Sequence, residues 1–233
     1  GALGVAGAQG AALALANTFN LVRDTDDGVW NGFNVLHMAA ARMGGLMLGW
    51  AQPGGIADLV AAQPKLLLAL GADEVDFNQF AGSFKVFIGH HGDKGAAAAD
   101  VILPGAAYSE KNGTYVNIEG RVQMSDKAVF APGDAREDWS ILRALSDVLG
   151  HTLPFGSFAD CRAAMVAAVP ALGFEGLASF DWSPPTLDAK ASGPVGYPIK
   201  DFYLTNAIAR ASATMQRCSA ELLHGTDILE AAE

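Results

Sequence analysis

The chain has 233 residues, which is enough for one large domain or two small ones. Hydrophobic residues make up 51% of it and charged residues only 17%, a balance that supports a packed core and excludes an intrinsically disordered chain. The formal net charge is −10. A surface of that sign repels phosphate backbones and anionic lipid, so nucleic acid is not expected as a partner.

The first 22 residues carry no charged side chain, but they do not predict a membrane span. They contain polar residues and four glycines, at positions 1, 4, 7 and 10, whereas a spanning helix needs about 20 mostly apolar residues. No basic region typical of a signal peptide precedes them. The glycines do not form the G-x-G-x-x-G pattern and no predicted strand precedes them, so we expect no nucleotide site there.

The two cysteines, Cys161 and Cys218, lie far apart in the sequence. An iron–sulfur cluster or a structural zinc site needs about four sulfur or nitrogen ligands, which two isolated thiols do not supply. A disulfide is possible but has no support from spacing, and the low count suits a reducing compartment. We expect two partly buried thiols on helices.

The first third of the chain predicts helices separated by loops. The expected helices cover residues 10–17, 35–43 and 56–62. Three aspartates and a glycine within residues 24–28 predict a loop. A connection rich in Gly and Pro precedes the third helix.

Three short apolar runs then predict strands, over residues 65–70, 84–88 and 101–103. Each run is followed by Gly or Pro, and the spacers between the runs are long enough for crossover connections. Continuous apolar runs of this kind are typical of buried parallel strands in an α/β sheet. Residues 113–122 alternate polar and apolar side chains and predict a more exposed hairpin.

Helical patterns return in the last hundred residues. The helix expected over 134–149 would be capped by Asp134, and the helix expected over 157–169 by Ser157, with Asp160 completing a capping box. Residues 181–198 are rich in Pro and Gly and predict a tether or surface loop.

A last helix is expected from Thr205, as its cap, to about Leu223. The terminal residues beyond Cys218 suit either a docking helix for a neighbour or a frayed end. We therefore divide the chain into an α/β domain over residues 1–180 and a tether with a helical tail over residues 181–233.

Residues 89–123 carry the most informative pattern, GHHGDKGAAAADVILPGAAYSEKNGTYVNIEGRVQ. Within it, ADV at 99–101 and LP at 103–104 precede E-x-x-G-T from Glu110 and N-x-E-G-R from Asn117. Each piece is common by itself, but the ordered set is specific. It resembles the molybdopterin oxidoreductase superfamily.

Two other runs resemble one branch of that superfamily. These are WNGFNVLH at residues 30–37, and FYLTN at 202–206 followed by IARAS at 208–212. They are similar to the large (75 kDa-type) iron–sulfur subunits of respiratory complex I, NADH–quinone oxidoreductase. The resemblance covers nearly the whole chain. It implies an α/β fold with Rossmann-like parallel-sheet layers of the formate dehydrogenase-like type, incomplete at its N-terminal side, with a C-terminal helical tail.

The resemblance also implies a function. In that family the 2Fe-2S and 4Fe-4S clusters are held by an N-terminal region, which we expect to lie outside this segment. We therefore expect no cofactor, no metal and no catalytic residue here, but a structural part of a proton-pumping NADH:ubiquinone oxidoreductase. One alternative is a fragment of a catalytic molybdopterin enzyme such as a formate dehydrogenase. A second is a stand-alone module that reuses the fold to bind a small molecule at the strand ends near His90.

Partners and location follow from the same resemblance. The expected partners are the flavoprotein and iron–sulfur subunits of the peripheral arm, together with the N-terminal part of the same subunit. The expected location is the cytoplasmic side of a bacterial inner membrane or the matrix side of the mitochondrial inner membrane, without direct insertion into the membrane.

Several polar groups are candidate sites. His90, His91 and Asp93 follow a predicted strand, where α/β proteins bind ligands, but neighbouring side chains point apart and we favour a polar loop over a metal site. Arg121 is suited to phosphate, yet a pair with Glu110 or Glu119 is expected, with Gly120 in a turn.

His37 lies among apolar neighbours on the expected helix over 35–43, where a core histidine is favoured over a ligand. No combination of Ser, His and Asp, or of Cys and His, has the support of a motif.

Overall fold

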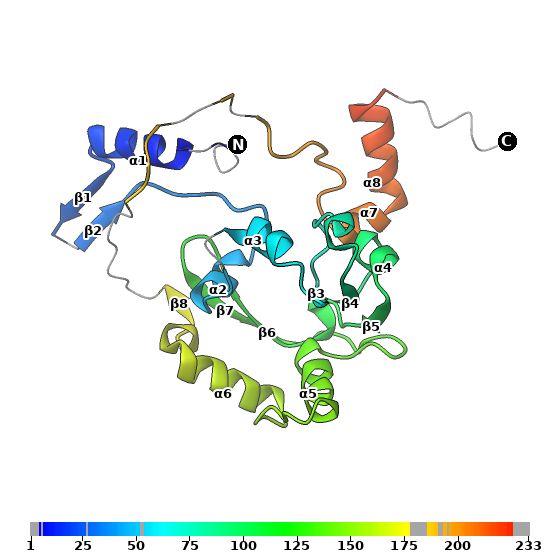
Figure 1. Cartoon of the computed structure of the whole chain (residues 1–233). Coiled ribbons are helices and arrows are strands. Elements are labelled where there is room, and N and C mark those ends of the chain that lie inside the picture. The colour runs from blue at the N-terminus through cyan, green and yellow to red at the C-terminus, as the bar shows by residue number, and fades with distance from the viewer. Residues whose placement is uncertain are drawn as a thin grey trace. The chain divides into compact units, whose positions relative to one another are not determined.

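The computed structural model describes residues 5, 7–26, 28–51, 54–177, 186–190, 193–194 and 196–225. The chain forms two compact units (Figure 1). The first comprises Gly1–Met38 and Ser179–Phe202, and the second comprises Ala39–Ala178 and Tyr203–Glu233. The division of domains near residue 180 stays a prediction.

The first unit contains helix α1 (Ala8–Thr18), as expected, and a two-stranded antiparallel sheet of β1 (Val22–Thr25) and β2 (Gly28–Asn31). The aspartate-rich run was predicted as a loop throughout, but only its tip is a turn, because the residues on both sides pair as strands. The Arg23 guanidinium lies 4.4 Å from the centre of the Trp30 ring and stabilises this pairing.

The helix predicted over residues 35–43 is wrong. Residues 32–37 form neither helix nor strand, and helix α2 begins only at Arg42 and ends at Met47. Leu36 and Met38 are 78% and 57% exposed, and the segment crosses the boundary between the two units at Met38, so it offers no continuous apolar face, and a short helix without tertiary packing is marginal. His37 is therefore half-buried on irregular backbone and is not a core histidine on a helix.

The second unit is built on the predicted parallel sheet. Helix α3 (Gly55–Ala62) leads into β3 (Leu66–Leu70), which pairs with β4 (Phe84–Gly89), and β4 pairs with β5 (Val101–Pro104). Both pairings are parallel, so the expected strands and their α/β arrangement are confirmed.

The two crossover connections of this sheet pack on the same face. The first contains the short helix η2 (Phe77–Phe80) and the second contains helix α4 (Lys94–Ala98) (Figure 1). Ala69 of β3 and Phe87 of β4 are buried beneath them in one apolar cluster, which also includes alanines of α4.

The opposite face is left largely uncovered towards the start of the strands. Strand register places four apolar side chains side by side there: Leu66, Leu68, Phe84 and Val101. All four are exposed, Leu66 by 57% and Phe84 by 52%. We call these four residues the bare sheet face.

A second sheet carries the other buried cluster. The predicted hairpin is confirmed as β6 (Gly113–Val116) and β7 (Arg121–Ser125), which pair antiparallel, and β8 (Gly176–Leu177) joins β7. Val116, Val122 and Leu172 are buried together beneath methionines of α2 and α6.

The helix predicted from Asp134 starts later, as α5 (Asp138–Val148) with Glu137 at its cap. The reason is a backbone tie: Arg136 donates its N–H to the Pro104 carbonyl and accepts the Ala106 N–H. That pairing holds the chain extended, so a helix cannot begin before it. The cap at Ser157 is confirmed, since its hydroxyl accepts the Asp160 N–H at the start of α6 (Phe158–Ala168).

The expected C-terminal helix is broken into pieces. Asn206, not Thr205, caps α7 (Ala207–Ala211), and extended backbone at Ser212 separates it from α8 (Ala213–Cys218). A π-helical turn, Ser219–Leu223, continues α8. Among the described residues, no helix combines the length and apolar character needed to cross a membrane.

The cluster around Leu172 predicts a large difference between two leucine-to-alanine variants. Leu172 is 1% exposed and Leu222 is 70% exposed. We expect Leu172→Ala to lower the free energy of unfolding by about 2–5 kcal/mol through lost burial and a residual cavity. Leu222→Ala, the matched control, should change it by less than about 0.5 kcal/mol. Urea unfolding followed by circular dichroism measures both, and equal losses would contradict this assignment of the core.

Candidate functional site at the carboxyl edge of the parallel sheet

The loops that leave β3 and β4 meet at one edge of the sheet, because parallel strands end on the same side. Asp73 lies in the loop after β3, and His90, His91 and Asp93 lie in the loop after β4. Asp73 is only 4% exposed, and its Oδ1 accepts the backbone N–H of Gly95 in α4. Its carboxylate therefore occupies the position at which such edges commonly present amides to ligands.

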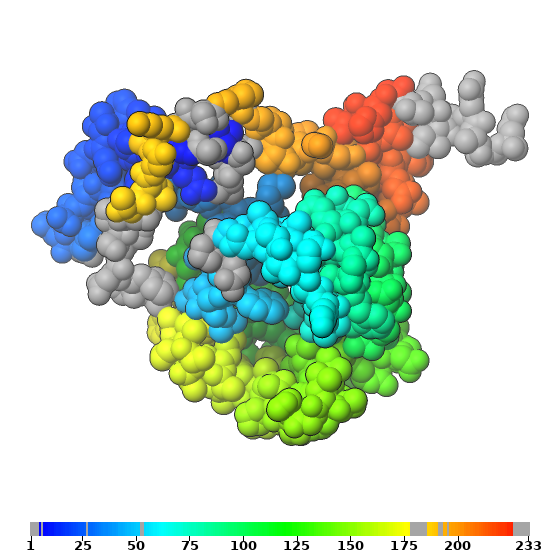
Figure 2. All heavy atoms as spheres, in the orientation of Figure 1, coloured from blue at the N-terminus to red at the C-terminus, as the bar shows by residue number. Residues whose placement is uncertain are grey.

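A third element reaches this edge from the C-terminal helices. Arg210 of α7 donates from Nη2 to Oδ2 of Asp73 at 2.9 Å and from Nε to Oδ2 of Asp93. The three side chains are 5–20% exposed. The hydrogen bond from Arg210 is the main reason that the pKa of Asp93 is held below its ordinary value. In Figure 2 the C-terminal segment, orange to red, lies directly against green residues from the middle of the chain.

The two histidines face one another, contrary to the expectation that neighbouring side chains point apart. Their Nδ1 atoms are 2.6 Å apart and their rings meet edge to face, so one neutral ring donates and the other accepts. Burial, followed by the nearby His91 and Lys111, lowers the pKa of His90 from its ordinary value. Asp93 does not join this pair, because it is bound to Arg210.

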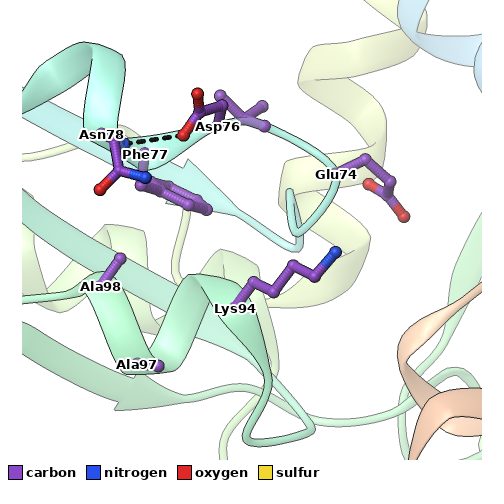
Figure 3. A pocket seen from close by; sticks show the side chains of 8 residues that line it. Glu74, Asp76, Phe77, Asn78, Lys94, Ala97 and Ala98 are labelled. Carbon is purple, nitrogen blue, oxygen red and sulfur yellow. Dashed lines mark hydrogen bonds between the residues drawn. The ribbon is translucent and has the colours of Figure 1, made fainter.

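An open cavity of about 580 Å³ lies beside this edge, between residues 74–78 and α4. Figure 3 shows the Lys94 side chain extending in the direction of Glu74, while Phe77, Ala97 and Ala98 form an apolar wall. The Asp76 carboxylate is turned to its own loop, where it accepts the Asn78 N–H. The cavity thus presents an ammonium group on a wide, open surface.

The N-x-E-G-R motif builds a turn between β6 and β7. Asn117 Oδ1 accepts the backbone N–H groups of Glu119 and Arg121, both at 3.0 Å, and Gly120 has a positive φ of 85°. Arg121 pairs with Glu119 at 3.6 Å on the surface, whereas Glu110 accepts the Ala107 N–H instead. The expected pair with Glu119 and the turn at Gly120 are confirmed.

Other predicted site residues lie apart from the edge. Cys161 on α6 and Cys218 on α8 are free and half-buried, as expected, and burial raises the pKa of the Cys161 thiol. Within the described part of the chain, no three His, Cys, Asp or Glu side chains are grouped so as to hold a metal ion.

Asp73 and Arg210 were not predicted from the sequence. Asp73 lies 137 residues before Arg210, so no local spacing connects the two. The available indication was a single cation among Ala and Ile in the IARAS run, which served only for the resemblance.

The family model of molybdopterin oxidoreductases matches residues 6–148, which is more than half of the chain. The chain belongs to the molybdopterin oxidoreductase family. A second family model, the C-terminal region of the G-type subunit of NADH-ubiquinone oxidoreductase, matches residues 178–218, which include Arg210.

Three relatives of this molybdopterin oxidoreductase family member are subunits of NADH-ubiquinone oxidoreductase, which is respiratory complex I. The 78 kDa mitochondrial NADH-ubiquinone oxidoreductase subunit of Neurospora crassa is 46% identical over 82% of this chain and 27% of its own length. The 75 kDa subunit of Reclinomonas americana is 41% identical over 82% and 29%. The 78 kDa mitochondrial subunit of Candida albicans is 40% identical over 83% and 28%. The chain thus spans less than a third of the length of these relatives.

The side chains at the edge do not fit the phosphate-bearing pterin that the family name implies. Asp73 already accepts the amide of Gly95, and the two carboxylates of Asp73 and Asp93 would repel phosphate groups. The guanidinium at this edge, that of Arg210, is bound by those carboxylates. The two free thiols likewise fall short of the four ligands of an iron–sulfur cluster.

The His90 environment predicts a titration below pH 6.5. We expect a midpoint below that value in a histidine NMR titration of the folded chain, because burial and His91 disfavour the imidazolium. Since the folded state then binds fewer protons than the unfolded state, stability should fall as the pH drops below about 6.5. In His91→Asn the midpoint should rise, because one cause of the lowering is gone. A midpoint at or above 6.5 in the unaltered chain would contradict this.

Proposed function

We propose that this chain is a structural part of the large peripheral-arm subunit of proton-pumping NADH–quinone oxidoreductase and holds no redox centre of its own. The observation that carries the proposal is that most of this chain is 40–46% identical to part of the 75 and 78 kDa subunits of that enzyme. The match to the C-terminal region of the G-type subunit supports the same branch of the family.

The chemistry of the sheet edge supports a role without a cofactor. In ligand-binding α/β proteins the carboxyl ends of the strands stay open to the ligand. Here side chains of the same chain take those positions: Asp73 accepts the Gly95 amide and Arg210 neutralises Asp73 and Asp93. Such an edge is suited to packing and poorly suited to binding a phosphate.

The proposed role is positional. Electron transfer from NADH through flavin and iron–sulfur clusters to quinone depends on fixed distances between the centres, which a rigid scaffold maintains. The partners on this proposal are the flavoprotein and iron–sulfur subunits and the N-terminal part of the same subunit. The location is the matrix side of the mitochondrial inner membrane or the equivalent bacterial side, attached peripherally.

The bare sheet face supports a close contact with the rest of the same subunit. Parallel sheets are normally covered on both faces, and both crossovers of this sheet lie on the opposite one. The part of each relative that this chain does not match is more than twice as long as the part that it matches. We propose that apolar helices from that additional part of the subunit cover Leu66, Leu68, Phe84 and Val101.

A replacement experiment tests the function. In the Neurospora crassa 78 kDa subunit, the aligned residues are exchanged for those of this chain. We expect complex I to assemble and to oxidise NADH with ubiquinone, because the scaffold is retained, whereas deletion of the same residues should abolish assembly. Molybdenum and pterin are measured in the purified complex. Their presence in stoichiometric amounts would favour the alternative, a catalytic molybdopterin enzyme.

A second experiment tests the bare sheet face. In the same replaced subunit, Leu66→Asp should lower the yield of assembled complex by about tenfold or more, because a charge would be buried without a partner. Leu222→Asp, at a residue at least as exposed but outside this face, is the matched control. In the isolated chain both variants should unfold within about 0.5 kcal/mol of the original, as surface substitutions do. Normal assembly with Leu66→Asp would rule out this face as a contact.

A further inference from the structure

We propose that Asp73 and Asp93 form a guanidinium-binding site, and that Arg210 is the intramolecular ligand that fastens the C-terminal helices to the sheet. Neither family match assigns this site, and the proposal does not depend on the proposed function. It rests on three groups brought together from distant parts of the chain.

The geometry selects a guanidinium group over other cations. Nε of Arg210 binds Asp93 and Nη2 binds Asp73, so two nitrogens of one planar fork serve two different carboxylates. Nη1 also donates to the Leu204 carbonyl at 3.4 Å. An ammonium group is a point charge on a single atom and does not reproduce this divided arrangement.

The receptor half of the site is held by the sheet itself. Asp73 follows β3 and is fixed by the Gly95 amide, while Asp93 follows β4 and directly precedes α4. A Cβ at Gly95 would lie 2.4 Å from Cε2 of Phe87 and 2.9 Å from Oδ1 of Asp73, so glycine suits this closely packed position. Asp73 is therefore fixed by a contact that does not involve the C-terminal segment, while Asp93 binds Arg210 directly.

The ligand half lies on two short helices. Helix α7 has five residues and α8 has six, lengths that are marginal without tertiary contacts. Arg210 links these helices to the sheet by two ion pairs, one of them with the almost fully buried Asp73. Loss of this guanidinium should release α7 and α8 while the sheet stays folded.

Hydrogen exchange measured by mass spectrometry on the full chain tests this. In Arg210→Ala, we expect the amides of Ala207–Cys218 to exchange about tenfold faster or more, as expected for local opening after loss of a partly buried ion pair. Amides of β3 and β4 should keep their protection. Adding about 20 mM guanidinium chloride, far below denaturing concentrations, should slow the exchange of α7 and α8 in part, because the free ion can bridge the two carboxylates to the Leu204 carbonyl that precedes α7.

Matched variants separate this site from general effects. Arg217→Ala removes an arginine from the same helices, but one paired with Glu221 at the surface, and should give neither fast exchange nor rescue. Arg210→Lys should show partial release. Sodium chloride or urea at the same concentration should not rescue Arg210→Ala, and guanidinium should fail in Arg210→Ala combined with Asp73→Asn. Protection of α7 in Arg210→Ala equal to that in Arg217→Ala, or rescue by sodium chloride, would overturn the proposal.

Discussion

In the second unit, the placement of the C-terminal helices depends on one constraint: two buried or half-buried carboxylates at the end of a parallel sheet need a cation. Asp73 is almost fully buried, and a buried carboxylate without a partner is strongly unfavourable. Arg210 satisfies Asp73 and Asp93 together, and in doing so brings a segment more than a hundred residues away onto the sheet. The same contact fixes where the C-terminal helices lie and closes the edge to anions.

The other structural features of this unit follow from the directions of its strands. Because β3, β4 and β5 run parallel and in order, both crossovers fall on one face, where Phe77 and Phe87 are buried. The opposite face keeps its apolar side chains, including Leu66 and Phe84, without a cover from those crossovers. A sheet with one face bare towards the start of its strands is a unit that gains stability by packing into something larger.

The sequence predicted those features that are encoded locally. Apolar runs ending in Gly or Pro located the three parallel strands, and Ser157 marked the start of α6, because a strand run or a cap is decided within a few residues. The helix over 35–43 and the cap at Asp134 failed because tertiary context decides them. The first segment crosses the boundary between the two units at Met38, and Arg136 is held extended by Pro104 and Ala106. The Asp73–Arg210 contact was beyond prediction for the same reason, since it joins residues with no common pattern.

The arrangement at the sheet edge also explains how a member of the molybdopterin oxidoreductase family can lack a fit to the family's cofactor. An edge that binds phosphate presents free amides and cations. Here the Gly95 amide is taken by Asp73, and Arg210 is taken by two carboxylates. Arg210 itself lies in the region matched to the C-terminal part of the G-type complex I subunit, outside the residues matched to molybdopterin oxidoreductases. The segment matched to the complex I subunit is thus the one that supplies the guanidinium bound at this edge.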